Sequence, residues 1–147
     1  MQRPRRRRGP GCVRAASDPR KAVVRRFYTD ALAGGRLDEL ERLLAPLFVG
    51  HDPLGALIDR ADYVDAIRML HESFTSLTVR VEDQLAEGDR VTTRWSATGT
   101  HTGDFAGIPA TGRVVTLAGT DIHRVSGDRI VELWEQLDLA SLVAQLV

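Results

Sequence analysis

The chain has 147 residues, of which 43% are hydrophobic, and its 20 basic and 20 acidic residues cancel. This length suits one domain that buries its own core without disulfides or structural metals. The single cysteine, Cys12, excludes an internal disulfide framework, which fits a reducing cytoplasm. We find no apolar run of the roughly 20 residues that a membrane helix needs, and no secretory signal in the first 20 residues. We therefore expect a soluble cytoplasmic protein with no membrane contact.

The two charge types are unevenly distributed along the chain. Residues 1–20 hold seven arginines and one acidic residue, Asp18, so the rest of the chain is acidic. Residues 1–17 are rich in Arg, Pro and Gly without apolar periodicity, which predicts a disordered extension. An arginine cluster can bind nucleic acid backbones, but this one lacks interleaved aromatic residues and precedes an acidic domain. We predict no nucleic acid partner, and a single folded domain over residues 18–147.

Helical periodicity begins at the end of this extension. Ser17 or Asp18 can cap a first helix that carries Pro19 in its first turn and ends at Gly34-Gly35. Residues 36–46 predict a second, shorter helix, and residues 60–74 predict a third, with a short strand and a loop between them. The expected buried side of the first helix consists of Val24, Phe27, Tyr28, Ala31 and Leu32.

The second half of the chain predicts strands joined by hairpins. Residues 77–85 alternate, with Leu77, Val79, Val81 and Leu85 on one face. Residues 90–101, 113–125 and 128–138 continue the series, and residues 139–146 can form a short closing helix. Helices followed by antiparallel strands predict an α+β fold, with the helices on one side of a curved sheet.

The strand around residues 116–125 carries an unexpected pair of polar residues. Its odd positions share one face, which begins at Val115 and ends at Val125 but holds Asp121 and His123 between them. The even positions are no more apolar. Alternation alone therefore does not decide which face is buried.

The position of Asp121 relative to the last strand depends on the hairpin register. A two-residue turn at Ser126-Gly127 places Asp121 opposite Glu132, and Gly119 opposite Trp134. Two adjacent buried carboxylates favour protonation of one of them, which is useful for proton transfer. A bulge after Gly127 would place Leu133 or Val131 opposite Asp121 instead. The sequence leaves these registers open.

Three segments carry a family resemblance that covers nearly all of the chain from about residue 18. VRRFYTDALAGGRLDELERLLAPLFVGHDP, GTHTGDFAGIPATGRVV and GTDIHRVSGDRIVELWEQLD resemble the SnoaL-like polyketide cyclases (ester cyclases) of the nuclear transport factor 2-like superfamily. The resemblance implies a cone-shaped barrel, in which a curved antiparallel sheet wraps around N-terminal helices and encloses one pocket. It also implies an intramolecular aldol condensation, for which Asp121 in GTDIHR matches the acid/base residue of the family.

The other candidate site residues follow from this expectation. His101 or Tyr28 could donate a hydrogen bond to an oxyanion, and His51 matches a position where the family tends to place a polar pocket residue. His71 and His123 are expected to be structural. The expected walls of a pocket for a flat apolar or aromatic substrate are Tyr28, Trp95, Phe105, Ile108 and Trp134, with Glu132 beside Asp121.

Other chemistries find little support in the sequence. There is no GxSxG elbow, no metal-binding histidine spacing on a helix and no dinucleotide fingerprint, so we expect neither a metal nor a cofactor. Two alternatives stay open: another isomerase or hydrolase of the same fold, such as a ketosteroid-isomerase-like proton shuttle, and a non-catalytic protein that binds a small apolar ligand. Relatives commonly pair through the outer face of the sheet, so a homodimer or higher homo-oligomer is expected.

Overall fold

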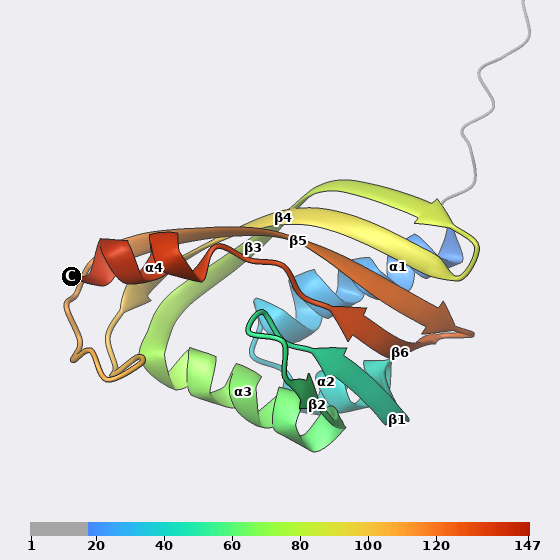
Figure 1. Ribbon diagram of the computed structural model, residues 1–147, viewed down its shortest axis with the longest axis horizontal. Helices are drawn as coiled ribbons and strands as arrows, with labels where there is room; N and C mark the ends of the chain where they lie inside the picture. The colour runs from blue at the N-terminus through green and yellow to red at the C-terminus, as the bar shows by residue number, and fades with distance from the viewer. Residues whose placement is uncertain (1–17) are drawn as a thin grey trace, which may run out of the picture.

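The computed structural model describes residues 18–147, and these form a curved, unclosed sheet with helices on its concave side (Figure 1). This is the expected α+β fold. The helical segments are α1 (Pro19–Arg26), η1 (Phe27–Leu32), α2 (Leu37–Leu43), α3 (Arg60–Ser73) and α4 (Leu139–Leu146). The strands are β1 (Leu44–His51), β2 (Leu57–Ile58), β3 (Phe74–Glu87), β4 (Arg90–His101), β5 (Val114–Ser126) and β6 (Arg129–Trp134). They are ordered β2-β1-β6-β5-β4-β3. The predicted extension and Cys12 lie outside the described residues.

The first helix changes its hydrogen-bond pattern halfway along. Asp18 caps α1 by accepting a hydrogen bond from the amide of Arg20 at 2.9 Å. From Phe27 the chain adopts π-helical geometry, in which the amide of Ala33 donates to the carbonyl of Tyr28 five residues earlier at 3.0 Å. Such a π turn is often found at functional sites. Here it belongs to the segment that buries the Tyr28 side chain under the sheet.

The long strand β3 departs from simple alternation. Val81 pairs with Trp95 but Asp83 pairs with Arg94, so Glu82 is an extra residue at a bulge. The bulge inverts the faces of all later residues. Leu85, expected beside Val81 on the buried face, is therefore 73% exposed, and that expectation was wrong.

The β5–β6 hairpin has neither of the registers considered from the sequence. Ser126 pairs with Arg129 across a turn at Gly127-Asp128, and Arg124 pairs with Glu132 because Val131 is bulged. Ile122 consequently faces Trp134. Compared with the first expected register, the last strand is displaced by three residues. An odd displacement turns every side chain to the opposite face, which changes the composition of the site.

The core lies between the sheet and the helices, with a smaller cluster at the far end of the long strands. Phe74, Val115, Leu142 and Leu146 form this second cluster, and α4 covers it at the end away from β1 and β2 (Figure 1). The Gln145 side chain fixes α4 to β5 through bonds of 2.8 Å to both the amide and the carbonyl of Thr116. Within residues 18–147, no helix combines the length and apolar character that crossing a membrane requires.

Candidate functional site

Asp121 lies on the buried face of β5 and is only 3% exposed. The odd-numbered positions of this strand are thus the inner ones. Its Oδ2 atom accepts hydrogen bonds from the Tyr28 hydroxyl at 2.6 Å and from the Trp95 indole N–H at 2.7 Å. Its Oδ1 atom accepts only a longer bond of 3.2 Å, from the backbone amide of Gln136. Two side chains from distant parts of the sequence, both expected in the site, therefore meet at the carboxyl group of Asp121.

Gly119 allows Trp95 to reach Asp121. The two strands pair Trp95 directly with Gly119. A Cβ atom at Gly119 would lie 2.7 Å from both the indole Cζ2 and the carbonyl oxygen of Gln136. Only a residue without a side chain leaves room for the indole ring and the crossing backbone at this point. The sequence GTD thus supplies both the space and the acceptor.

The surroundings of Asp121 shift its acidity. Burial raises the pKa of the carboxyl to about 6, although the hydrogen bonds from Tyr28, Gln136 and Trp95 act in the opposite direction by stabilising the charged form. At pH 7 most molecules therefore hold an ionised Asp121 that can take up a proton with little cost. A carboxyl with this acidity is suited to general acid–base catalysis near neutral pH.

A second carboxyl group, which is half-buried, stands beside Asp121, and it belongs to Glu135 rather than Glu132. Ile122 pairs with Trp134, and Gly119 bridges Leu137, so the intervening register sets Asp121 against Glu135. Burial and the charge of Asp121 raise the pKa of Glu135 to about 7, while hydrogen bonding with Tyr63 acts in the opposite direction. The expected pair of carboxyl groups exists, with a different partner.

His123 lies two residues from Asp121 on the same inner face and is fully buried. Its ring packs edge-on against Phe27, at 4.7 Å between centroids, and against Tyr28, at 5.5 Å. Neither ring nitrogen has a hydrogen-bond partner within residues 18–147. Burial lowers its pKa to about 3, so the imidazole is neutral at pH 7.

An apolar cavity of about 70 Å³ extends along the inner face from Trp95 toward the second cluster. Trp95 therefore contacts both the cavity and Asp121. Helices η1, α3 and α4 contribute the walls opposite the sheet. The lining side chains include Leu32, Leu70, Phe74, Val79, Leu117 and Leu142.

His101 lies at the other end of this face. Asp121 pairs with Thr93 on β4, and His101 follows eight residues later, about 26 Å along the strand. The Nδ1 atom of His101 contacts Thr111, through the hydroxyl at 3.0 Å and the amide at 3.2 Å. The structure thus separates the two residues expected to be catalytic. His101 is therefore too distant to stabilise an oxyanion beside Asp121, and the other expected donor, the Tyr28 hydroxyl, is the one that contacts this carboxyl group.

Phe105 and Ile108 also lie at this far end. They pair with each other in the loop after β4 and pack against the second cluster. Phe105 contacts Phe74, with 5.2 Å between ring centroids. Both therefore lie near the end of the cavity that is distant from Asp121.

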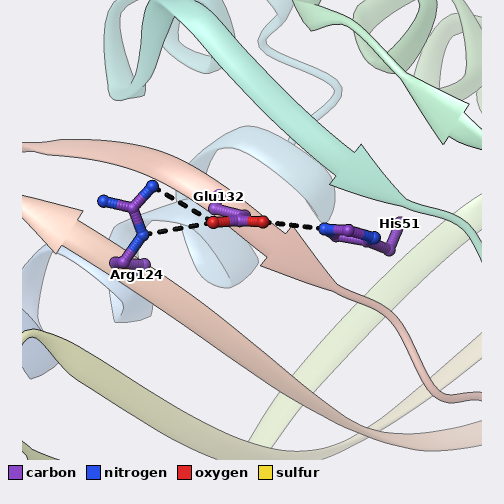
Figure 2. Close-up of polar contacts among 3 residues, drawn as sticks. All are labelled: His51, Arg124 and Glu132. Atoms are coloured by element: carbon purple, nitrogen blue, oxygen red, sulfur yellow. Dashed lines mark hydrogen bonds and ion pairs between the residues drawn. The ribbon is translucent and has the colours of Figure 1, made fainter.

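His51, Glu132 and Trp134 face the outer side of the sheet. Figure 2 shows Glu132 between His51 and Arg124: the Nε2 atom of His51 lies 2.8 Å from Oε2, and Arg124 donates to Oε1 at 3.1 Å. The His51 and Trp134 rings stack at 5.1 Å with an angle of 7°. The expectation that these three line the pocket was wrong, because the three-residue displacement of β6 turns them outward.

Sequence reasoning missed Tyr63 and Glu135. Tyr63 lies within residues 60–74, the third predicted helix, and nothing in its spacing distinguishes a phenol with a polar partner from one without. The sequence did contain a signal for Glu135. Ile130 and Leu133 can both face the core only if the strand has a bulge between them. Glu135 lies two positions after Leu133 and therefore shares its inward face.

Comparison with known proteins identifies the family. A profile of the SnoaL-like polyketide cyclases matches residues 22–146, so the chain belongs to this family. Its structure resembles that of IdmH from Streptomyces antibioticus, assigned as a polyketide cyclase, with 32% identity over 86% of this chain and 97% of that one and a TM-score of 0.76. AclR from Streptomyces galilaeus, assigned as a hydroxylase, has 27% identity, covers 86% and 80% of the two chains, and gives a TM-score of 0.79.

TsrD from Streptomyces laurentii has 24% identity over 90% of this chain and 97% of that one, with a TM-score of 0.78, and shows the fold alone. The search of curated proteins gave no significant match. Since structures this similar are assigned to different reactions, the chemistry must be argued from the site.

Proposed function

We propose that this protein is a cyclase that closes a ring in a polyketide-type or β-keto ester substrate by intramolecular aldol condensation. The observation that carries the proposal is the buried Asp121 carboxyl, which accepts hydrogen bonds from Tyr28 and Trp95 beside an apolar cavity. Family membership supports the reaction class. The substrate class follows from the cavity, whose walls favour an apolar or aromatic molecule.

In this mechanism the Asp121 carboxylate removes the acidic proton between two carbonyl groups of the substrate. Its Oδ1 atom, with one long backbone contact, is the available acceptor. The resulting enolate carbon attacks a third carbonyl group, and a new carbon–carbon bond closes the ring. As Asp121 becomes neutral, its attraction for the Tyr28 hydroxyl weakens, so this hydroxyl can donate to the developing oxyanion. The apolar walls hold the chain in a folded conformation before reaction.

Substrate binding must also enlarge the cavity. Sites for drug-sized ligands have volumes of about 300–1,000 Å³, whereas this cavity measures about 70 Å³. Leu142 and Leu146 attach α4 over one end of it, and the helix is held to β5 through Gln145. We expect bound substrate to displace α4, with enhanced amide hydrogen exchange at Thr116 as the measurable sign.

The test compares the wild-type protein with Asp121→Asn on a panel of β-keto esters and aromatic polyketide intermediates, followed by product mass and ring closure. Removing the general base should lower turnover by about 10²–10⁴-fold while the folded structure persists. Full turnover by the variant would contradict the assignment of Asp121. Binding without turnover by the wild-type protein would favour the alternative of a ligand-binding protein. A product without ring closure would favour an isomerase if its mass equals that of the substrate, and a hydrolase if water has been added.

We also propose that the protein functions in the cytoplasm as a homodimer or higher oligomer that pairs through the outer face of the sheet. The small and mixed side chains of this face support the proposal: Thr92, Arg94, Ser96, Thr98, Thr116, Ala118, Thr120 and Ile122. Sedimentation at micromolar concentration should give at least a dimer. A monomer would contradict it.

A further inference from the structure

Among residues 18–147, strand pairing sets the carboxyl group of Glu135 beside Asp121 on the concave face. Glu135 directly follows β6, and the pairs Ile122–Trp134 and Gly119–Leu137 on either side fix its register. Residues opposite each other on adjacent strands have Cβ atoms about 5 Å apart. Its backbone amide donates to the carbonyl of His51 at 3.0 Å, which ties this position to β1 as well. The two carboxyl groups are thus positioned by backbone pairing rather than by flexible side chains.

Each carboxyl group has a phenol of its own. Tyr28 from η1 donates to Asp121 at 2.6 Å, and the buried Tyr63 from α3 is near enough to Glu135 for hydrogen bonding to lower the pKa of that carboxyl. Phe27 separates the two phenols, with its ring edge-on to Tyr28 at 5.0 Å and stacked on Tyr63 at 5.8 Å. The arrangement therefore contains two similar halves, and only one of them is used by the mechanism above.

The remaining titratable neighbours do not neutralise this pair. His123 on β5 is buried and uncharged at neutral pH. Asp52, after β1, adds a further negative charge near Glu135. Its Oδ1 atom accepts hydrogen bonds from the backbone amides of Leu54 and Ala56. No cationic side chain forms an ion pair with either carboxyl group within the described residues. Two negative charges here would repel each other in a poorly solvated space.

A pair of this kind retains one proton near neutral pH. The pKa values of about 6 for Asp121 and about 7 for Glu135 indicate that the proton resides mainly on Glu135. Because the two groups interact, these values describe the titration of the pair. Carboxyl groups whose acidities differ in this way can serve as base and acid in one reaction.

We propose that Asp121 and Glu135 act as one acid–base pair, in which Asp121 removes the carbon-bound proton and Glu135 protonates the oxygen of the attacked carbonyl group. The inference rests on the proposed function and extends it to a second catalytic residue. Tyr63 positions Glu135, as Tyr28 positions Asp121.

The proton balance of this cycle closes without a co-reactant. The substrate loses one C–H proton to Asp121 and forms a carbon–carbon bond, while the carbonyl π bond breaks and its electron pair moves to oxygen. Glu135 gives that oxygen one proton and becomes a carboxylate. A single proton then passes from Asp121 to Glu135 and restores the starting state. The product is an isomer of the substrate, as an aldol closure requires.

The first experiment needs no substrate. Carboxyl groups are labelled with ¹³C, and their titration is followed by NMR in the wild-type protein, in Asp121→Asn and in the control Glu82→Gln, whose carboxylate lies on β3 against Ser96. We expect Glu135 to titrate near pH 7 in the wild type and the control, and clearly lower in Asp121→Asn, because the neighbouring charge is gone. Titration of Glu135 near its ordinary value of 4.5 in the wild type, or no shift in Asp121→Asn, would overturn the pairing.

The second experiment measures kcat/KM against pH with the substrate that gives cyclised product. The wild type should give a narrow bell, rising as Asp121 ionises and falling as Glu135 loses its proton. Glu135→Gln should reduce the rate by about 10²-fold or more and abolish the alkaline limb, while Glu135→Asp should retain that limb. A folded Glu135→Gln with wild-type rate and alkaline limb would overturn the role of Glu135. If Asp121→Asn is inactive in the same series, the proposed function survives that result; an active Asp121→Asn would refute the function itself.

Discussion

Glu132 and Glu135 lie three residues apart in one segment, yet the fold gives them opposite properties. Glu132 faces outward, where hydrogen bonds from His51 and Arg124 lower the pKa of its carboxyl (Figure 2). Glu135 faces inward, where burial raises its pKa to about 7. Neighbouring faces of a strand alternate, so an odd spacing separates the two environments completely. The face of the sheet on which each glutamate lies, and not its residue type, therefore sets the protonation state of its carboxyl group.

The inner face should be intolerant of charge of either sign, and His123 offers the strongest test. Its folded pKa of about 3 lies below the unfolded value of 6.5, so the unfolded chain binds a proton first and stability is lost as pH falls below about 6.5. Replacing His123 with Phe removes this proton uptake. The unfolding free energy of the wild type should fall between pH 7 and pH 4. In His123→Phe this fall should be smaller by about 3 kcal/mol. Chemical denaturation at both pH values measures it, and an unchanged loss would argue against a buried neutral imidazole.

Asp121 should show the opposite pH dependence. Its folded pKa of about 6 exceeds the unfolded value of 3.8, so the folded protein binds the extra proton, and stability falls as pH rises from about 4 to 7. Asp121→Asn removes this cost and should raise the unfolding free energy by about 3 kcal/mol at pH 8, with little gain at pH 4. Thermal melting across this range tests the sign. Destabilisation at pH 8 would indicate a structural carboxylate instead.

Gly119 tests whether the inner face depends on close packing against Trp95. In Gly119→Ala the new Cβ must displace the indole ring or the Gln136 carbonyl, which lie 2.7 Å away. We expect a loss of about 1–2 kcal/mol in stability, and reduced turnover because the indole moves from Asp121. Ala118→Gly, on the exposed face next to it, is the control for backbone effects. Equal turnover in Gly119→Ala and wild type would show that the Trp95 contact is dispensable.

The outer cluster should give the smallest effect. Glu132→Gln removes an acceptor shared by His51 and Arg124, but its side chain is 21% exposed and solvent screens such pairs. The cost should be below about 1 kcal/mol at pH 7, and it should vanish as pH falls through the lowered pKa of Glu132, since the wild-type carboxylate then becomes protonated as well. Denaturation midpoints at pH 7 and pH 3 measure the difference. A loss as large as that of an inner-face variant would break the contrast between the two faces.

The helices and the buried face of β5 follow closely from local patterns. The stripe that includes Phe27 and Tyr28 is buried as its spacing predicts, and Asp18 caps the helix that precedes it. The position of Asp121 on the inner face came from its resemblance to a family motif, because both faces of β5 are comparably apolar. The bulge at Glu82 had no recognisable signal, since one extra residue leaves the alternation before it intact.

By itself, the sequence determined the order of elements and the α+β class, and it singled out Asp121 as a candidate, because periodicity and motif are properties of short segments. Only the tertiary structure decided which residues surround Asp121. A turn at Gly127-Asp128 and one bulged residue, Val131, replaced Glu132 with Glu135, and the length of β4 separated His101 from the site. Side chains alternate with a period of two, so a local change of one or three residues reverses a whole face, and strand pairing over long distances settles which register buries the most apolar surface.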